Sequence, residues 1–120
     1  MEMEFKKGDI IWSEYEDRDS KKLKHPAIFC NYEGTDFYGI MLTHSKKYPD
    51  NIKMERDHFE IWTKLSFKKE IYFVNQLLRK FKDWKPIKIG KLTEDGIYFI
   101  EKKLTKKKAI TFEDYINKTF

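Results

Sequence analysis

The chain has 120 residues and a mass of 14.7 kDa, and 40% of its residues are hydrophobic, 38% charged and 17% aromatic. This composition predicts a single domain over residues 1–120 with an aromatic-rich core, and it excludes an intrinsically disordered chain. The net charge is +5, and apolar runs of about four or five residues are far shorter than the roughly 20 that a membrane-spanning helix needs, so we expect no membrane contact.

In the first 75 residues, short segments rich in Ile, Phe, Tyr and Trp are bounded by Gly, Asp and Asn. This pattern predicts short β-strands. The first strand begins over residues 8–12, and residues 14–24 are predicted to form a charged loop. A second strand is expected over residues 26–31, with Pro26 at its first position, where a missing N–H is tolerated. A turn at residues 33–36 leads to a third strand over residues 37–43.

Further along, a polar loop is expected over residues 45–51. Short strands are predicted after it, over residues 52–54, 59–62 and 70–73. Residues 75–82 fit a helix and a strand equally well, because their apolar residues satisfy both periods.

The last third of the chain predicts one more strand and two helices. Residues 86–92 alternate between polar and apolar as a strand does. Thr93 followed by two acidic residues is a helix start, and the helix is expected to reach about Lys103. Gly96 is the weak point, since Asp95-Gly96 also fits a hairpin turn. A short capped helix is predicted over residues 111–120.

The charge is unevenly distributed along the chain. Residues 1–60 carry 10 Lys+Arg and 13 Asp+Glu, net −3, whereas residues 61–120 carry 15 and 7, net +8. A basic second half suits binding to nucleic acid or to an acidic protein segment, and a Lys-rich surface without any partner is the alternative.

Cysteine and histidine usage bears on location and cofactors. The single cysteine, Cys30, can form no disulfide within the chain, and the acidic N-terminal residues lack the apolar segment of a secretory signal, so we expect a cytoplasmic protein. Cys30 is expected to be a small core residue. The three histidines have no zinc-ligand spacing, so we expect neither a metal nor another cofactor.

Five short motifs follow one another along the chain: Gly8-Asp9-Ile10-Ile11-Trp12, Lys24-His25-Pro26-Ala27-Ile28, Leu42-Thr43-His44-Ser45, Val74-Asn75-Gln76-Leu77-Leu78-Arg79 and Ile89-Gly90-Lys91-Leu92-Thr93-Glu94-Asp95. Their order resembles that of the MazF/PemK/Kid toxin family. In that family a Gly-Asp-hydrophobic strand is followed by Arg-Pro-Ala-hydrophobic, by a strand ending in Thr-Ser, by a late strand carrying a Gln, and by a lead-in to the final helix. The last of these favours the helix over the hairpin turn at Gly96.

The resemblance covers about residues 5–104 and leaves residues 105–120 as a C-terminal extension. It implies a mainly β fold with helices (α+β), namely a compact, twisted, antiparallel small barrel of the MazF/PemK type with a C-terminal helix. It also implies a homodimer that cleaves single-stranded RNA without a metal, and an acidic antitoxin-like protein as partner.

Metal-free RNA cleavage needs a base for the 2′-hydroxyl, a cation near the phosphate and an acid for the 5′-oxygen. The family's Arg before the strand Pro serves the phosphate and acid role, and that position here is His25, beside Lys24. The family's Thr-Ser pair matches Thr43 and His44, or Thr43 and Ser45 if one residue is skipped. The resemblance therefore implies His25, Lys24, Thr43 and His44 around the scissile phosphate, with the two histidines able to act as acid and base.

Residues 79–85 interleave cations with two aromatic residues, a composition suited to phosphate contacts and base stacking. The RNA-binding residues predicted in this segment are Arg79, Lys80, Lys82, Trp84 and Lys85. The alternative is that Phe81 and Trp84 anchor the segment in the core while its lysines are solvated.

A catalytically silent barrel that binds RNA or a protein, for example as a phage or mobile-element inhibitor, is the alternative function. It follows from the loss of the family's Arg before Pro26, since a histidine does not replace a permanently charged, planar guanidinium one for one.

Overall fold

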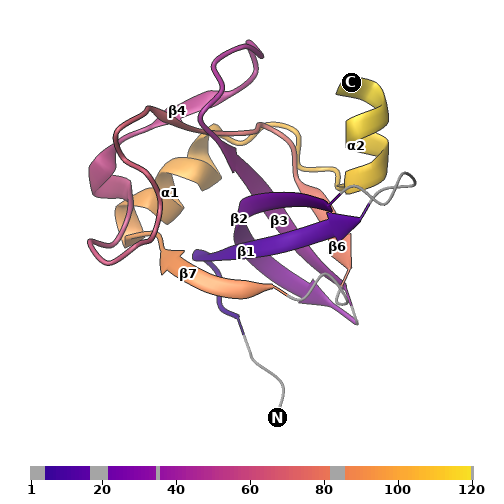
Figure 1. The fold of residues 1–120 in the computed structure, drawn as a ribbon, viewed down its shortest axis with the longest axis horizontal. Coiled ribbons are helices and arrows are strands. Elements are labelled where there is room, and N and C mark those ends of the chain that lie inside the picture. Colours follow the sequence, from indigo (N-terminus) through magenta and orange to yellow (C-terminus); the bar gives the residue numbers. More distant parts are fainter. Residues whose placement is uncertain (1–4, 17–21, 35, 82–85, 120) are drawn as a thin grey trace.

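The structure is a computed structural model, and it describes residues 5–16, 22–34, 36–81 and 86–119. The described chain is mainly β with two short α-helices, as the sequence predicts (Figure 1). In chain order its elements are β1 (Asp9–Glu16), β2 (Lys22–Glu33), β3 (Asp36–Thr43), β4 (Ile52–Met54), the 3-10 helix η1 (Arg56–His58), β5 (Ile71–Phe73), β6 (Leu78–Phe81), β7 (Ile87–Lys91), α1 (Glu94–Lys103), β8 (Ile110–Thr111) and α2 (Phe112–Thr119).

The strands form one eight-stranded sheet in the described part of the chain, in the order β4-β5-β3-β2-β1-β7. β6 pairs with the first half of β3 and carries β8, and every pair is antiparallel except β6 with β8. No pairing among the described residues joins β4 to β7, so the sheet is open between these strands. The mainly β class is confirmed, and the closed barrel stays a prediction.

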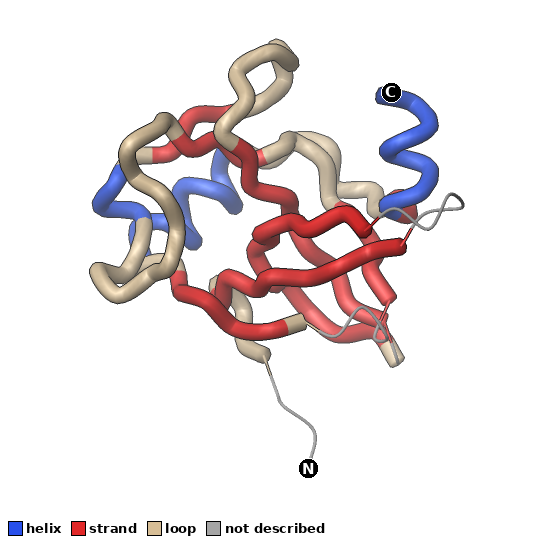
Figure 2. The backbone as a smooth tube through the Cα atoms, in the orientation of Figure 1, coloured by secondary structure: helices blue, strands red, loops and turns tan. Residues whose placement is uncertain are grey.

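Both faces of the central strands are covered, because neighbouring side chains on a strand point to opposite faces. Ile10 and Ile11, for example, are both fully buried but belong to different clusters. Figure 2 shows α1 and α2 on different sides of the strands. Ile100 and Leu104, from α1 and its end, belong to the cluster of Ile10, whereas Phe112 of α2 packs with residues of β3 and β6.

Backbone geometry explains the Gly8-Asp9 motif. Gly8 has φ +93°, which favours glycine, and a Cβ there would lie 2.6 Å from Ile97 Cδ1 in α1. Asp9 is buried, accepts a hydrogen bond from the Lys6 N–H at 2.8 Å and pairs with the Lys88 ammonium at 3.1 Å. This motif therefore has a structural role at the start of β1.

The predicted loop over residues 14–24 is wrong at both ends, because β1 continues to Glu16 and β2 begins at Lys22. The register pairs Glu14 with Lys24 and Glu16 with Lys22, and opposite charges at paired positions favour antiparallel pairing. Pro26 consequently lies inside β2, opposite Trp12, and not at its first position.

The predicted strand over residues 59–62 is also wrong. Phe59 makes one isolated bridge with Leu92, and a turn follows it. The other short strands are confirmed as β4 and β5, and the undecided segment at residues 75–82 contains the strand β6.

Both predicted helices are confirmed. Thr93 is the N-cap of α1, and its hydroxyl accepts a hydrogen bond from the Gly96 N–H at 3.1 Å. Gly96 is buried inside the helix, so the hairpin turn does not form. Thr111 caps α2 in the same way by accepting from the Asp114 N–H at 3.1 Å.

Candidate functional site

A pocket of about 370 Å³ lies at the C-terminal end of β3, and we call it the His44 pocket. Its walls come from β1, β2, the end of β3, the start of β5 and the segment between η1 and β5. The lining residues are Trp12, Pro26, Leu42, Thr43, His44, Lys64, Leu65, Ser66 and Ile71.

The strand pairing explains why this pocket forms. The register between β2 and β3 ends at Ala27 opposite Met41, and the end of β3 pairs with β5 instead. The segment carrying Lys64 is held in place by a hydrogen bond from the Lys64 N–H to the Ile89 carbonyl at 2.8 Å. Three segments distant in the sequence thus meet at the end of β3.

His44 is exposed at the end of β3, and its ring is held by the backbone. Its Nδ1 lies 3.0 Å from the Glu70 carbonyl oxygen. A carbonyl only accepts, so Nδ1 carries the proton in this contact, and Nε2 of the neutral ring is an acceptor. Of the two neutral tautomers of His44, the contact therefore selects the one whose Nε2 is an acceptor.

Thr43 and Ser45 stabilise the turn that follows β3. The Thr43 hydroxyl accepts from the Ser45 N–H at 3.1 Å, and the Ser45 hydroxyl accepts from the Lys47 N–H at 3.2 Å. Accepting one hydrogen bond leaves the proton of the Thr43 hydroxyl available for donation.

Glu70, whose carbonyl binds His44, is itself fixed by two side chains. The Tyr72 hydroxyl donates to the Glu70 carboxylate, and the Lys53 ammonium lies 3.4 Å from its other oxygen. The hydrogen bond from Tyr72, followed by that from Lys53, lowers the pKa of Glu70, and the same bond to Glu70 raises the pKa of Tyr72.

Lys24 and His25 lie in β2, opposite Glu14 and Ser13 of β1. Their side chains are outside the described part of the structure, so their part in the site stays a prediction. Pro26, the next residue, does line the His44 pocket.

The predicted RNA-binding segment is only partly described. Arg79 is in β6, and its Nε and Nη2 donate to the same oxygen of Asp36, at 2.8 and 2.7 Å. In this pairing the positive charge of Arg79 is neutralised by a carboxylate of the protein itself. Lys80 lies in β6 opposite Phe37, with its side chain not described, and Lys82, Trp84 and Lys85 lie outside the described residues.

Sequence reasoning missed Lys64 and Ser66 as residues of this pocket. They follow a turn and carry no motif, and their segment is held by hydrogen bonds to β7 and by the packing of Leu65 and Phe67 against the core. The described residues include no group of three or more His, Cys, Asp or Glu side chains that could hold a metal ion.

Comparisons of the chain with protein-family models, with curated proteins and with solved structures give no match. Among the described residues, no helix has the length and apolarity required to cross a membrane.

Proposed function

We propose that the protein is a toxin-like, metal-independent endoribonuclease of the cytoplasm that cleaves single-stranded RNA in the His44 pocket. One observation carries the proposal: Thr43 and His44, which the family resemblance selects, line the same pocket as Lys64 and Ser66, beside the residue that follows His25. A titratable ring, hydroxyl groups and a cation are the groups that acid–base cleavage of a phosphodiester requires.

In the proposed reaction, Nε2 of neutral His44 takes the proton of a 2′-hydroxyl, and the 2′-oxygen attacks the adjacent phosphorus. The bond from phosphorus to the 5′-oxygen breaks, and protonated His25 donates its proton to that oxygen. The products are a 2′,3′-cyclic phosphate and a free 5′-hydroxyl. Lys24, Lys64 and the Thr43 hydroxyl stabilise the charge that develops on the phosphate oxygens.

The direct test is incubation of the purified protein with a mixed-sequence RNA in EDTA. We expect cleavage with cyclic phosphate ends. Intact RNA after hours at micromolar protein, with folding verified by circular dichroism, would refute the nuclease.

His44→Asn is the sharpest single variant, because an asparagine amide can still donate to the Glu70 carbonyl but cannot transfer a proton at neutral pH. We expect His44→Asn and His25→Ala each to lower the cleavage rate by about 10²-fold or more. Lys102→Ala, an exposed position on α1, serves as the matched control. A variant that cleaves at the wild-type rate removes its histidine from the mechanism.

Two partners belong to this proposal: a second copy of the chain and an acidic antitoxin-like protein. Sedimentation velocity tests the first, and we expect the mass of a dimer.

A silent RNA- or protein-binding module is the second candidate, favoured by His25 at the position of the family's Arg. RNA that is bound but stays intact in the EDTA assay would support it.

A further inference from the structure

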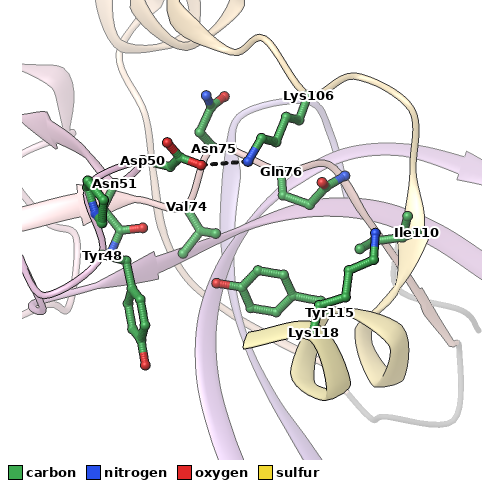
Figure 3. A pocket seen from close by; sticks show the side chains of 11 residues that line it. Tyr48, Asp50, Asn51, Val74, Asn75, Gln76, Lys106, Ile110, Tyr115 and Lys118 are labelled. Carbon is green, nitrogen blue, oxygen red and sulfur yellow. Dashed lines mark hydrogen bonds and ion pairs between the residues drawn. The ribbon is translucent and has the colours of Figure 1, made fainter. Parts of the chain in front are cut away.

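A second pocket, of about 330 Å³, lies beside α2, and we call it the C-terminal pocket (Figure 3). It is formed by three parts of the chain: the loop before β4, the connection from β5 to β6, and the segment from Lys106 to α2. Its volume falls in the range of small-ligand sites, about 300–1,000 Å³.

The lining of this pocket combines aromatic, apolar and basic groups. Tyr48 and Tyr115 come from opposite sides, and Tyr115 points from α2 toward Val74 (Figure 3). The Lys106 ammonium is paired with the Asp50 carboxylate at 2.6 Å, which leaves the exposed Lys118 as the source of one net positive charge among the lining residues. Aromatic faces next to a cation are the elements of a nucleotide site.

The walls of the C-terminal pocket are joined by hydrogen bonds. Asn75 and Thr105 are linked by two of them, at 2.7 and 2.9 Å, and the Gln76 amide donates to the Lys108 carbonyl at 2.9 Å. The Leu77 N–H donates to the Lys106 carbonyl at 3.0 Å. The site is therefore preorganised, which lowers the entropic cost of binding a ligand.

One short segment joins the two pockets. His44 lines the first pocket and Tyr48 the second, while Lys46 and Lys47 between them are exposed. Four residues span at most about 14 Å. A single strand bound at the His44 pocket therefore has only a short distance, marked by two exposed lysines, to cross to the C-terminal pocket.

We propose that the C-terminal pocket binds a nucleotide of the RNA strand that enters the His44 pocket, with its base against Tyr48 and Tyr115 and its phosphate on Lys118. The identity of the strand as RNA rests on the proposed function. The pocket gives residues 105–120 a role in substrate binding, separate from the bond cleavage at His44.

The test is equilibrium binding of a fluorescein-labelled, mixed-sequence 2′-O-methyl octanucleotide, which lacks the free 2′-hydroxyl needed for cleavage. We expect Tyr115→Leu and Tyr48→Leu to weaken binding about tenfold or more, as for the loss of one base stack. We expect Lys118→Ala to weaken binding severalfold and Lys118→Glu to weaken it further. Lys107→Ala is the matched control, because Lys107 is exposed but does not line the pocket.

Lys118 variants keep the test decisive if a tyrosine variant does not fold, since Lys118 is exposed on the last turn of α2. Wild-type affinity in Lys118→Glu, or a loss equal to that of Lys107→Ala, overturns the inference, as does failure of the wild type to bind the octanucleotide. If the protein cleaves RNA but binds the octanucleotide equally well in the wild type and in the Lys118 variants, only this inference is overturned. Binding that depends on Lys118 without any cleavage overturns only the nuclease.

Discussion

Gly96 lies where α1 packs directly against the backbone of η1. A Cβ at this position would lie 2.2 Å from the backbone carbonyl oxygen of His58, an atom that cannot move without shifting η1. The same carbonyl accepts from the Thr93 N–H at 2.9 Å. The missing side chain thus lets the start of the helix dock directly on η1.

We expect Gly96→Ala to lower the free energy of unfolding by about 1–3 kcal/mol, as overpacking does, although alanine is the better helix former by about 1 kcal/mol. Urea denaturation measures this, with Lys102→Ala on the exposed side of α1 as control. A Gly96→Ala protein as stable as the wild type would contradict the close contact.

Cys30 is partly buried and packs against the core cluster that contains Ile10 and Ile28, close to the core position that its place in the sequence predicts. Burial raises the pKa of its thiol to about 12. Because the thiolate is the reactive form, we expect a disulfide reagent at pH 8 to modify the folded protein far more slowly than the urea-unfolded chain. Equal rates in the two states would show that the thiol is accessible.

At the scale of the elements, the pairing of β1 with β2 explains why the loop predicted over residues 14–24 from their charged composition is wrong at both ends. Charged residues are typical of loops, but paired positions of opposite charge support a strand pair, and pairing depends on register. The start of α1 was predictable because its cap and acidic first turn are local features.

Glu70, the residue before β5, makes two contacts: its carboxylate accepts a hydrogen bond from the Tyr72 hydroxyl, and its backbone carbonyl accepts one from His44. The lowered pKa of Glu70 means that its ionised form stabilises the fold. This contribution is complete above about pH 5, where Glu is also ionised in the unfolded chain, and is lost as the pH falls through the lowered pKa.

We therefore expect Tyr72→Phe, which removes the main donor to Glu70, to be less stable than the wild type at pH 7. We expect this difference to shrink below about pH 4. Urea midpoints across this pH range measure it, and Glu70→Gln should show the same narrowing. A constant gap for Tyr72→Phe would indicate that the hydroxyl acts through packing alone.

At the scale of the whole molecule, part of the basic charge in the described second half of the chain is paired with acidic side chains. Arg79 is paired with Asp36 and Lys106 with Asp50, so part of that charge is neutralised by carboxylates of the protein itself. The lysines that line the two pockets, Lys64, Lys106 and Lys118, all follow residue 60, whereas Lys46 and Lys47, between the pockets, precede it.

If Lys46, Lys47, Lys64 and Lys118 each neutralise one phosphate, the affinity for single-stranded RNA falls with salt at a slope of about −0.7 per contact. We expect a loss of roughly 50-fold between about 50 and 200 mM salt, and a slope about 0.7 shallower in Lys118→Ala. Titrations of the labelled octanucleotide at several salt concentrations measure this. A flat salt response would exclude phosphate contacts.

The sequence by itself determined the mainly β class and the start of α1, because strand propensity and helix capping are local properties, whereas the catalytic role of Thr43 and His44 stays a prediction. Only the tertiary structure decided how far β1 and β2 extend and that residues 78–81 form the strand β6. It also decided that Lys64 and Ser66 line the His44 pocket together with Thr43 and His44. These depend on register and on hydrogen bonds between distant segments, such as that from Lys64 to Ile89, whose energies arise only once the sheet has formed.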